Sequence, residues 1–317
     1  METIRKVLFV DDTHPVLKAE LTAMGFSCDE FTGSTSADCR LVIGDYFGAV
    51  IRSKITFDAA MLDAATQLRF IARVGAGMES IDVEYAKSKG IVCFNSPEGN
   101  RDAVAEHALG MLLSLLNNLN RADAEVRKGI WRREANRGIE IKGKTIGIIG
   151  YGNMGCAFAQ RLKGFGCKIL AYDKYKTGFS DKFVTECDME TIFAETDILS
   201  LHVPLTAETR YLVNEEYIQK FRKNIWLINT SRGPVVNTAA LVDALKSGKV
   251  NGAALDVLEY EKSSFEAMDA EAFPEPLKQL VAFDNVILSP HIAGWTVESK
   301  YKLAKVLADK IRMHFFG

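Results

Sequence analysis

The sequence predicts an α/β protein with two doubly wound parallel-sheet domains. Short apolar runs of strand length alternate with helix-period segments along most of the chain, which is the pattern of parallel strands covered by helices on both faces. The 317 residues exceed what one hydrophobic core usually serves, so two domains are expected. The character of the sequence also changes near Asn100, where a long apolar helical segment begins.

Individual elements follow from the same periodicity. A helix is predicted over Asp102–Leu119, and because its second half is apolar on nearly all sides, it should be buried at a domain or subunit interface. Two further helices are predicted, from Asn153 to about Gly166 and from Val297 to about Phe315, and the acidic stretch Glu259–Glu275 indicates a surface loop. The predicted strands are Val7–Val10, Ala49–Arg52, Arg69–Val74, Ile91–Phe94, Thr145–Ile149, Lys168–Tyr172, Asp197–Val203, Asn224–Asn229, Gly252–Val257 and Asn285–Leu288.

Charge and composition exclude several classes of protein. Lys and Arg number 39 and Asp and Glu number 41, so the net charge of −2 does not favour nucleic acid or an anionic membrane as a partner. The N-terminal apolar run is too short for a secretory signal, and no stretch approaches the roughly 20 apolar residues of a transmembrane helix. The six cysteines show no C-x-x-C pair and no metal-finger spacing. We therefore expect a cytoplasmic protein with reduced thiols and no metal site.

Three glycines follow the apolar run Lys144–Ile149 in the pattern Gly150-x-Gly152-x-x-Gly155, immediately before a predicted helix. In a dinucleotide-binding turn the first glycine permits the tight turn, the second lets a pyrophosphate approach the backbone, and the third allows close helix–strand packing. Asp173 ends the next predicted strand, 23 residues after Gly150, near the spacing expected for the acid that binds the adenosine ribose. The alternative is a glycine-rich turn followed by a capping aspartate. The combined pattern favours a dinucleotide site.

Polar residues follow three later strands, at the end where an open α/β sheet places its ligand crevice. The stretches are N-T-S-R-G (229–233), A-L-D-V-L-E-Y-E (254–261) and S-P-H-I-A-G (289–294). Taken singly, Arg232 could be a surface cation, Glu261 part of the acidic loop and His291 a buried histidine. Together they suit hydride transfer at a carbinol carbon. Histidine exchanges the hydroxyl proton, a carboxylate favours the imidazolium, and arginine holds a substrate carboxylate and polarises its carbonyl.

The chain resembles the D-isomer-specific 2-hydroxyacid dehydrogenases over essentially its whole length. The resemblance implies a Rossmann NAD-binding domain of residues 99–291, a flavodoxin-like substrate-binding domain of residues 1–98 and 292–317, and a cleft between them. It also implies a homodimer whose arm corresponds to about Asn120–Ile139. The matching stretches occur in order: R-V-G-A-G-M-E-S-I-D (73–82), A-V-A-E-H-A-L-G-M-L-L (103–113), G-I-I-G-Y-G-N-M-G (147–155), L-H-V-P-L-T-A-E-T (201–209), I-N-T-S-R-G-P-V-V (228–236), G-A-A-L-D-V (252–257) and S-P-H-I-A-G-W-T (289–296).

The same resemblance implies roles for individual residues. Arg232, Glu261 and His291 take the family's catalytic positions. Backbone N–H groups of Val74, Gly75, Ala76 and Gly77 are expected to hold the substrate carboxylate in a nest-type anion site. The expected contacts of NAD are Gly150, Gly152, Asn153, Met154, Gly155, Asp173, Val203, Pro204, Thr209, Thr230, Ser231, Asp256 and Gly294.

Two departures from the family pattern concern the catalytic carboxylate. Lys262 stands where proline commonly follows the glutamate, and 30 positions separate Glu261 from His291, a longer loop than many relatives carry. Glu259 is therefore a rival for the role, while Asp256 is interpreted as a cofactor contact. The other histidines, His14, His107, His202 and His314, are given ordinary structural roles.

Retention of all three chemical residues favours an NAD-dependent dehydrogenase over a non-catalytic NAD(H)-sensing protein of the same fold. A formate dehydrogenase fits less well, because the chain is short at its N-terminus. Asp173 predicts NAD rather than NADP, since its carboxylate would face a 2′-phosphate at close range, although Lys174 and Lys176 could soften the repulsion.

The segment V-I-R-S-K (50–54) bears on the substrate. Arg52, Ser53 and Lys54 resemble the segment with which phosphoglycerate dehydrogenases hold the substrate phosphate, so the predicted pair is 3-phosphoglycerate and 3-phosphohydroxypyruvate, in serine biosynthesis. The alternative for the segment is a solvated basic turn. The chain ends at Gly317 without the C-terminal regulatory domain of the longer enzymes, although short forms exist. Glyoxylate or hydroxypyruvate reduction is the nearest rival function.

Overall fold

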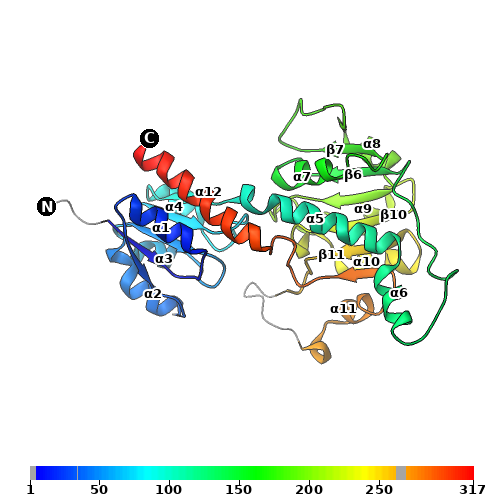
Figure 1. Cartoon of the computed structure of the whole chain (residues 1–317), viewed down its shortest axis with the longest axis horizontal. Helices are drawn as coiled ribbons and strands as arrows, with labels where there is room; N and C mark the ends of the chain where they lie inside the picture. Colours follow the sequence, from blue (N-terminus) through cyan, green and yellow to red (C-terminus); the bar gives the residue numbers. More distant parts are fainter. Residues whose placement is uncertain (1–4, 34, 262–268) are drawn as a thin grey trace. The chain divides into compact units, whose positions relative to one another are not determined.

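A computed structural model describes residues 5–33, 35–261 and 269–317 of the chain (Figure 1). The chain divides into two compact units. The first comprises Met1–Arg101 and Trp295–Gly317, and the second comprises Asp102–Gly294. The sequence-based division placed the two boundaries at residues 98 and 291. In the described ranges no helix is long and apolar enough to cross a bilayer.

The first unit is a five-stranded parallel sheet in the order β2-β1-β3-β4-β5 with helices on both faces. Alternate residues of the strands face opposite sides, so Val7 and Phe9 pack with α1 and α12 while Leu8 packs with α2, α3 and α4. The strands are β1 Lys6–Phe9, β2 Ser27–Glu30, β3 Gly48–Ile51, β4 Phe70–Arg73 and β5 Val92–Phe94; the helices are α1 Pro15–Ala23, α2 Ser36–Val42, η1 Ile43–Asp45, α3 Ala59–Ala64, α4 Val83–Ser88 and α12 Val297–Phe316.

The second unit is a seven-stranded parallel sheet in the order β12-β11-β10-β9-β6-β7-β8. Helices α5 and α7 cover one face, and α8, α9, α10 and α11 cover the other. The strands are β6 Thr145–Ile149, β7 Lys168–Tyr172, β8 Val184–Glu186, β9 Ile198–Leu201, β10 Ile225–Asn229, β11 Val250–Leu255 and β12 Val286–Leu288. The helices are α6 Leu119–Val126, α7 Asn153–Arg161, α8 Met189–Glu195, α9 Glu215–Gln219, η2 Gly233–Val235, α10 Thr238–Lys246, η3 Ala270–Ala272 and α11 Glu275–Leu280; α5, Pro97–Leu116, begins in the first unit.

The predicted fold class is confirmed, since both sheets are parallel and flanked by helices on both faces. The strand order reverses at β6, whose neighbours are β7 on one side and β9 on the other. In an open α/β sheet this reversal creates a crevice at the carboxyl ends of the strands. Several details differ from prediction. Helix α5 begins at Pro97 instead of Asp102, α7 ends at Arg161 instead of about Gly166, and strands β2 and β8 were not predicted. Residues 262–268 of the predicted acidic loop lie outside the described part.

Candidate active site

The glycine-rich turn joins β6 to α7 at the strand reversal. Gly150 has φ +90, and a Cβ atom there would lie 2.6 Å from the His202 carbonyl oxygen. Only glycine adopts this turn without strain and without a backbone clash. Gly155 lies in the first turn of α7, where a Cβ atom would be 2.1 Å from the Gly150 carbonyl oxygen, so the helix packs directly against the turn. The first and third glycines therefore have the geometry that the motif requires.

Gly152 differs from both of its partners. A Cβ atom at Gly152 would meet nothing within 4 Å, so the space in front of this residue is open. Gly152 is also the N-cap of α7 and provides no side-chain hydrogen bond to the first helical N–H groups. Asn153 and Met154 form the start of the helix. Open space before an uncapped helix N-terminus fits a pyrophosphate, which the N–H groups and helix dipole would bind.

Asp173 follows β7 directly, and its carboxylate is fixed by backbone groups. Oδ2 accepts the Tyr151 N–H at 2.7 Å, and Oδ1 accepts the N–H groups of Tyr175 at 2.9 Å and Lys176 at 3.1 Å. Asp173 therefore also caps the turn that follows it, which is the role that the alternative interpretation gave it. A carboxylate oxygen can accept two hydrogen bonds, so Oδ2 retains one acceptor position for a ribose hydroxyl.

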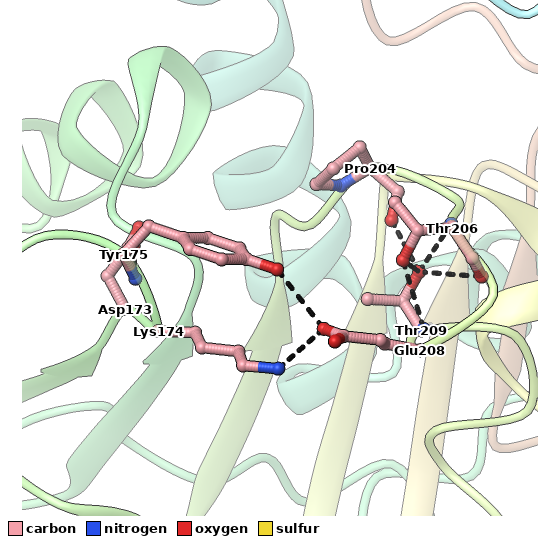
Figure 2. Close-up of polar contacts among 7 residues, drawn as sticks. All are labelled: Asp173, Lys174, Tyr175, Pro204, Thr206, Glu208 and Thr209. Carbon is pink, nitrogen blue, oxygen red and sulfur yellow. Dashed lines mark hydrogen bonds and ion pairs between the residues drawn. The ribbon is translucent and has the colours of Figure 1, made fainter.

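The loop after β9 carries three of the expected cofactor contacts, Val203, Pro204 and Thr209. The Thr209 hydroxyl donates to the Pro204 carbonyl oxygen at 2.6 Å and accepts the Thr206 N–H at 2.8 Å (Figure 2). The loop is thus closed on itself by a threonine pair. The Thr209 proton is used within the loop, so this hydroxyl would meet a cofactor as an acceptor.

Arg232 lies in the turn after β10, together with Thr230 and Ser231. The Arg232 Nη1 donates to the Ser231 carbonyl oxygen at 2.6 Å, and the Asn229 amide donates to the Arg232 carbonyl oxygen at 3.0 Å. The Ser231 hydroxyl donates to Asn229 Oδ1 at 2.8 Å. The Thr230 hydroxyl is buried with no hydrogen-bond partner among the described residues. Asn229, which was not singled out as a site residue, therefore sets the shape of this turn.

His291 and Glu261 meet in the second unit. His291 Nδ1 lies 3.1 Å from Glu261 Oε1, and about a quarter of each side chain is exposed. The rival carboxylate is engaged elsewhere, since Glu259 accepts the Tyr211 hydroxyl at 2.9 Å and the Thr238 N–H at 2.9 Å. The carboxylate facing the histidine is thus Glu261.

His291 is held in an uncommon backbone conformation. Its φ is +58, in the left-handed region that few residues other than glycine adopt, although histidine is one of those enriched there. The His291 N–H donates to the Asp256 carbonyl oxygen at 2.7 Å, which ties the loop to the end of β11. Strained backbone of this kind persists where the surroundings fix it, and it is concentrated at functional sites.

The Asp256 side chain is the anchor of the same loop. It is 1% exposed, and its carboxylate accepts the Ser289 hydroxyl at 2.6 Å and the N–H groups of Ile292 and Ala293, each at 2.9 Å. Burial alone would raise the pKa of Asp256, but hydrogen bonds from His107, Ser289, Ala293 and Ile292 outweigh burial and hold its pKa below the usual value. Among the described residues, Oδ2 accepts only the Ala293 N–H. Gly294 ends the loop and the second unit.

His107 also contacts Ser289 and Asp256, and the sequence did not indicate this contact. Its Nε2 lies 3.0 Å from the Ser289 hydroxyl and 3.4 Å from Asp256 Oδ1. A histidine on a helix carries no sequence signal for such a contact, because its partners lie more than 140 positions along the chain. His202 fits the structural role expected of it: its Nε2 lies 2.9 Å from the Ser200 hydroxyl, and desolvation lowers the pKa of His202 to about 4.

The candidate substrate residues of the first unit follow β3 and β4. Val74 and Gly75 use their N–H groups on the carbonyl oxygens of Ile51 and Arg73 at 2.9 Å each, so these two groups are not available to an anion as predicted. In the described part of the chain the N–H groups of Ala76 and Gly77 have no hydrogen-bond partner. The predicted anion-binding nest therefore has two available donors, the N–H groups of Ala76 and Gly77.

Arg52, at the end of β3, is only partly open to solvent. Its N–H donates to Asp11 Oδ2 at 2.6 Å, and its guanidinium stacks on the Trp295 ring at 4.5 Å from the ring centre. Burial lowers the pKa of Arg52, while the nearby carboxylates of Asp11 and Asp12 act in the opposite direction. Ser53 follows directly and is also part-buried, and Lys54 is exposed.

The second unit matches a known domain over most of its length. Residues 109–293 match the family model described as "D-isomer specific 2-hydroxyacid dehydrogenase, NAD binding domain". Among solved structures, D-lactate dehydrogenase from Aquifex aeolicus, complexed with NAD and lactic acid, aligns with a TM-score of 0.83 and 28% identity over 98% of this chain and 95% of that one.

Curated relatives carry three different enzyme names. A hydroxypyruvate reductase of Thermotoga maritima is 39% identical over 83% of this chain and 82% of that protein. A glyoxylate reductase of Thermofilum pendens is 41% identical over 80% of this chain and 74% of that protein. A D-3-phosphoglycerate dehydrogenase of Archaeoglobus fulgidus is 36% identical over 90% of this chain, which spans 53% of that longer protein.

The chain belongs to the D-isomer-specific 2-hydroxyacid dehydrogenase family. It is an NAD-dependent enzyme of that class, and the prediction of an enzyme with an NAD cofactor is confirmed. The family, the cofactor and the fold therefore follow from the sequence, while the relatives' names leave the substrate open among several small 2-keto acids.

Proposed function

We propose that the protein interconverts a small D-2-hydroxy acid and its 2-keto acid, with Arg232, Glu261 and His291 as the catalytic residues. The contact between His291 Nδ1 and Glu261 Oε1 at 3.1 Å carries the proposal. A carboxylate on Nδ1 leaves Nε2 as the nitrogen that exchanges a proton with substrate, and it stabilises the imidazolium that keto-acid reduction consumes.

NADH, when bound, supplies the hydride to the keto carbon. His291 gives its proton to the carbonyl oxygen during reduction and takes it back during oxidation. Arg232 polarises the carbonyl and pairs with the substrate carboxylate through its planar fork. The free N–H groups of Ala76 and Gly77 are proposed to bind the carboxylate as well.

Glu261→Gln tests the role of the carboxylate. The imidazole loses the carboxylate that holds its Nδ1, so kcat for keto-acid reduction should fall about tenfold or more. The matched control is Glu259→Gln, which breaks the contacts with Tyr211 and Thr238 but leaves the histidine's partner in place. A loss of kcat in Glu259→Gln and none in Glu261→Gln would reverse the assignment.

The proposed substrate pair is 3-phosphoglycerate and 3-phosphohydroxypyruvate, which would place the enzyme in serine biosynthesis. Its support is the pairing of a guanidinium and a hydroxyl at Arg52 and Ser53, which can bind phosphate oxygens by bidentate and single hydrogen bonds. Hydroxypyruvate or glyoxylate is the second candidate. Two observations favour this second candidate. The Arg52 guanidinium stacks on the Trp295 ring, and the Asp11 carboxylate, which accepts the Arg52 backbone N–H, would repel a phosphate bound at Arg52.

The ratio of kcat/KM for phosphohydroxypyruvate to that for hydroxypyruvate separates the two candidates. If the phosphate binds Arg52, we expect a ratio of about ten or more in the wild type, falling towards one in Arg52→Ala, because a charge-assisted bidentate contact is worth about 1.5–3 kcal/mol. Lys18→Ala, which removes an exposed cation of the same unit, should leave the ratio unchanged. A ratio near one that neither variant moves would show that Arg52 does not bind a substrate phosphate, and the substrate would stay unassigned.

NAD is expected to be strongly preferred to NADP. Asp173 has an acceptor position for a ribose hydroxyl, whereas a 2′-phosphate would meet its charge at close range. Asp173→Ala should reduce the preference for NAD over NADP, chiefly by impairing the use of NAD. The test is kcat/KM with each cofactor, and equal values in the wild type would exclude this role for Asp173.

We also propose that the protein is a cytoplasmic homodimer associating through the segment of about Asn120–Ile139. This segment exposes large apolar side chains, with Trp131 75% and Val126 48% exposed. Exposed apolar surface of this kind marks association sites. All six cysteines are free thiols, as a reducing compartment requires.

A further inference from the structure

Two loops face each other at the strand reversal of the second unit. Residues 173–176 follow β7 and residues 202–209 follow β9, the two neighbours of β6. The cofactor site proposed above lies at this reversal, with the adenosine ribose at Asp173. The present inference rests on that site.

Glu208 is presented by a preorganised loop. Besides the Thr209 bonds to Pro204 and Thr206, the Thr209 N–H donates to the Thr206 hydroxyl at 3.3 Å. Thr206 and Thr209 therefore bond reciprocally across the turn that contains Glu208. A turn fixed in this way holds the side chain between the two threonines in one direction at low entropic cost.

Glu208 bridges to the loop after β7 (Figure 2). Lys174 Nζ donates to Glu208 Oε2 at 2.6 Å, and the Tyr175 hydroxyl donates to the same oxygen at 3.1 Å. The hydrogen bond between Lys174 and Glu208 is the main reason that the pKa of Lys174 is raised and the pKa of Glu208 is lowered. Both charged side chains are more than half exposed, so the pair can open in water.

This bridge determines where the lysine charge lies. Lys174 directly follows Asp173 in the chain, so its ammonium is a cation that could neutralise a 2′-phosphate at the ribose. In the structure its charge is instead satisfied by a carboxylate on the opposite loop. The other nearby lysine, Lys176, donates its ammonium to the Tyr151 carbonyl oxygen at 3.3 Å.

We propose that Glu208 is a second determinant of cofactor selectivity, a positioning residue that holds Lys174 away from the 2′-phosphate of NADP(H). Asp173 opposes the 2′-phosphate directly, and Glu208 withholds the cation that would offset this repulsion. NAD(H) carries no group that needs the lysine, so its binding does not depend on the bridge.

The test measures dissociation constants of NADH and NADPH by nucleotide fluorescence, without substrate, in a set of four proteins: wild type, Glu208→Gln, Lys174→Met and the double variant. Glu208→Gln should bind NADPH about five- to tenfold more tightly, the effect of one freed charge at a solvated site, and NADH within about twofold of wild type. Lys174→Met should cancel the gain, so that the double variant binds NADPH as Lys174→Met does. The gain should shrink as salt is raised.

A matched control removes an equal charge elsewhere in the unit. Glu216→Gln breaks an exposed pair with Lys220 at 2.8 Å on α9 and should change neither dissociation constant. A gain in NADPH binding in that variant would reveal a general charge effect and overturn the proposal. So would a gain that persists undiminished in the Lys174→Met background.

Failure of the inference is distinguishable from failure of the cofactor site. If the wild type binds NADH and Glu208→Gln leaves NADPH binding unchanged, only the role of Glu208 is overturned. If the wild type binds neither nucleotide, the cofactor site itself is wrong and the inference falls with it.

Discussion

His291→Asn is expected to lower kcat for keto-acid reduction by about 10²–10⁴, with the dissociation constant of NADH unchanged within about threefold. Asparagine cannot donate a titratable proton, so the carbonyl oxygen would develop charge without an acid nearby. Asparagine is preferred to alanine because φ at this position is +58, which asparagine tolerates and alanine does not. The substitution therefore removes the chemistry while retaining the backbone.

The control for this variant is the same substitution at another histidine. His14 is the N-cap of α1 and accepts the Val16 N–H at 3.2 Å, and asparagine is equally suited to that position. His14→Asn should match the wild type in kcat, KM and thermal midpoint. If His291→Asn retained kcat within tenfold of wild type, the proton would have to come from a group other than His291.

Central strands were the most predictable part of the fold. Thr145–Ile149 and Lys168–Tyr172 were predicted with the bounds that the structure gives them, because strands buried on both faces are continuous apolar runs. The strands β2, S-C-D-E, and β8, V-T-E, were not predicted. Both lie at a sheet edge, where a strand is bonded on one side only and its polar side chains carry no apolar pattern.

Individual site residues could be predicted where the backbone itself requires a particular residue type. Gly150 and Gly155 are such cases, because turn geometry and close packing exclude other residues at these two positions. The choice between Glu259 and Glu261 was not available from sequence, since the two lie on either side of Tyr260 and differ only in their tertiary partners. Tyr211 and Thr238 hold one of them, and His291 holds the other.

Gly152→Ala is expected to raise the dissociation constant of NADH by about tenfold or more while leaving the cofactor-free protein as stable as the wild type. The added Cβ atom meets nothing within 4 Å, and the backbone at Gly152 is extended, with φ −87, so alanine adopts it readily. The methyl group would occupy only the space proposed for the pyrophosphate. Fluorescence titration with NADH and a thermal midpoint without nucleotide measure the two effects.

Gly155→Ala tests a glycine that the packing of the fold requires, in contrast to Gly152, which is proposed to leave room for the ligand. Its Cβ atom would lie 2.1 Å from the Gly150 carbonyl oxygen and 3.2 Å from Ile148 Cγ2, so α7 must move whether or not a nucleotide is bound. We expect the free energy of unfolding of the cofactor-free protein to fall by about 1–3 kcal/mol, together with NADH affinity. Gly110→Ala, on α5 with open space around it, is the control and should leave NADH binding unchanged. If Gly152→Ala bound NADH as the wild type does, the open space would not hold the pyrophosphate, and the turn would be a structural feature alone.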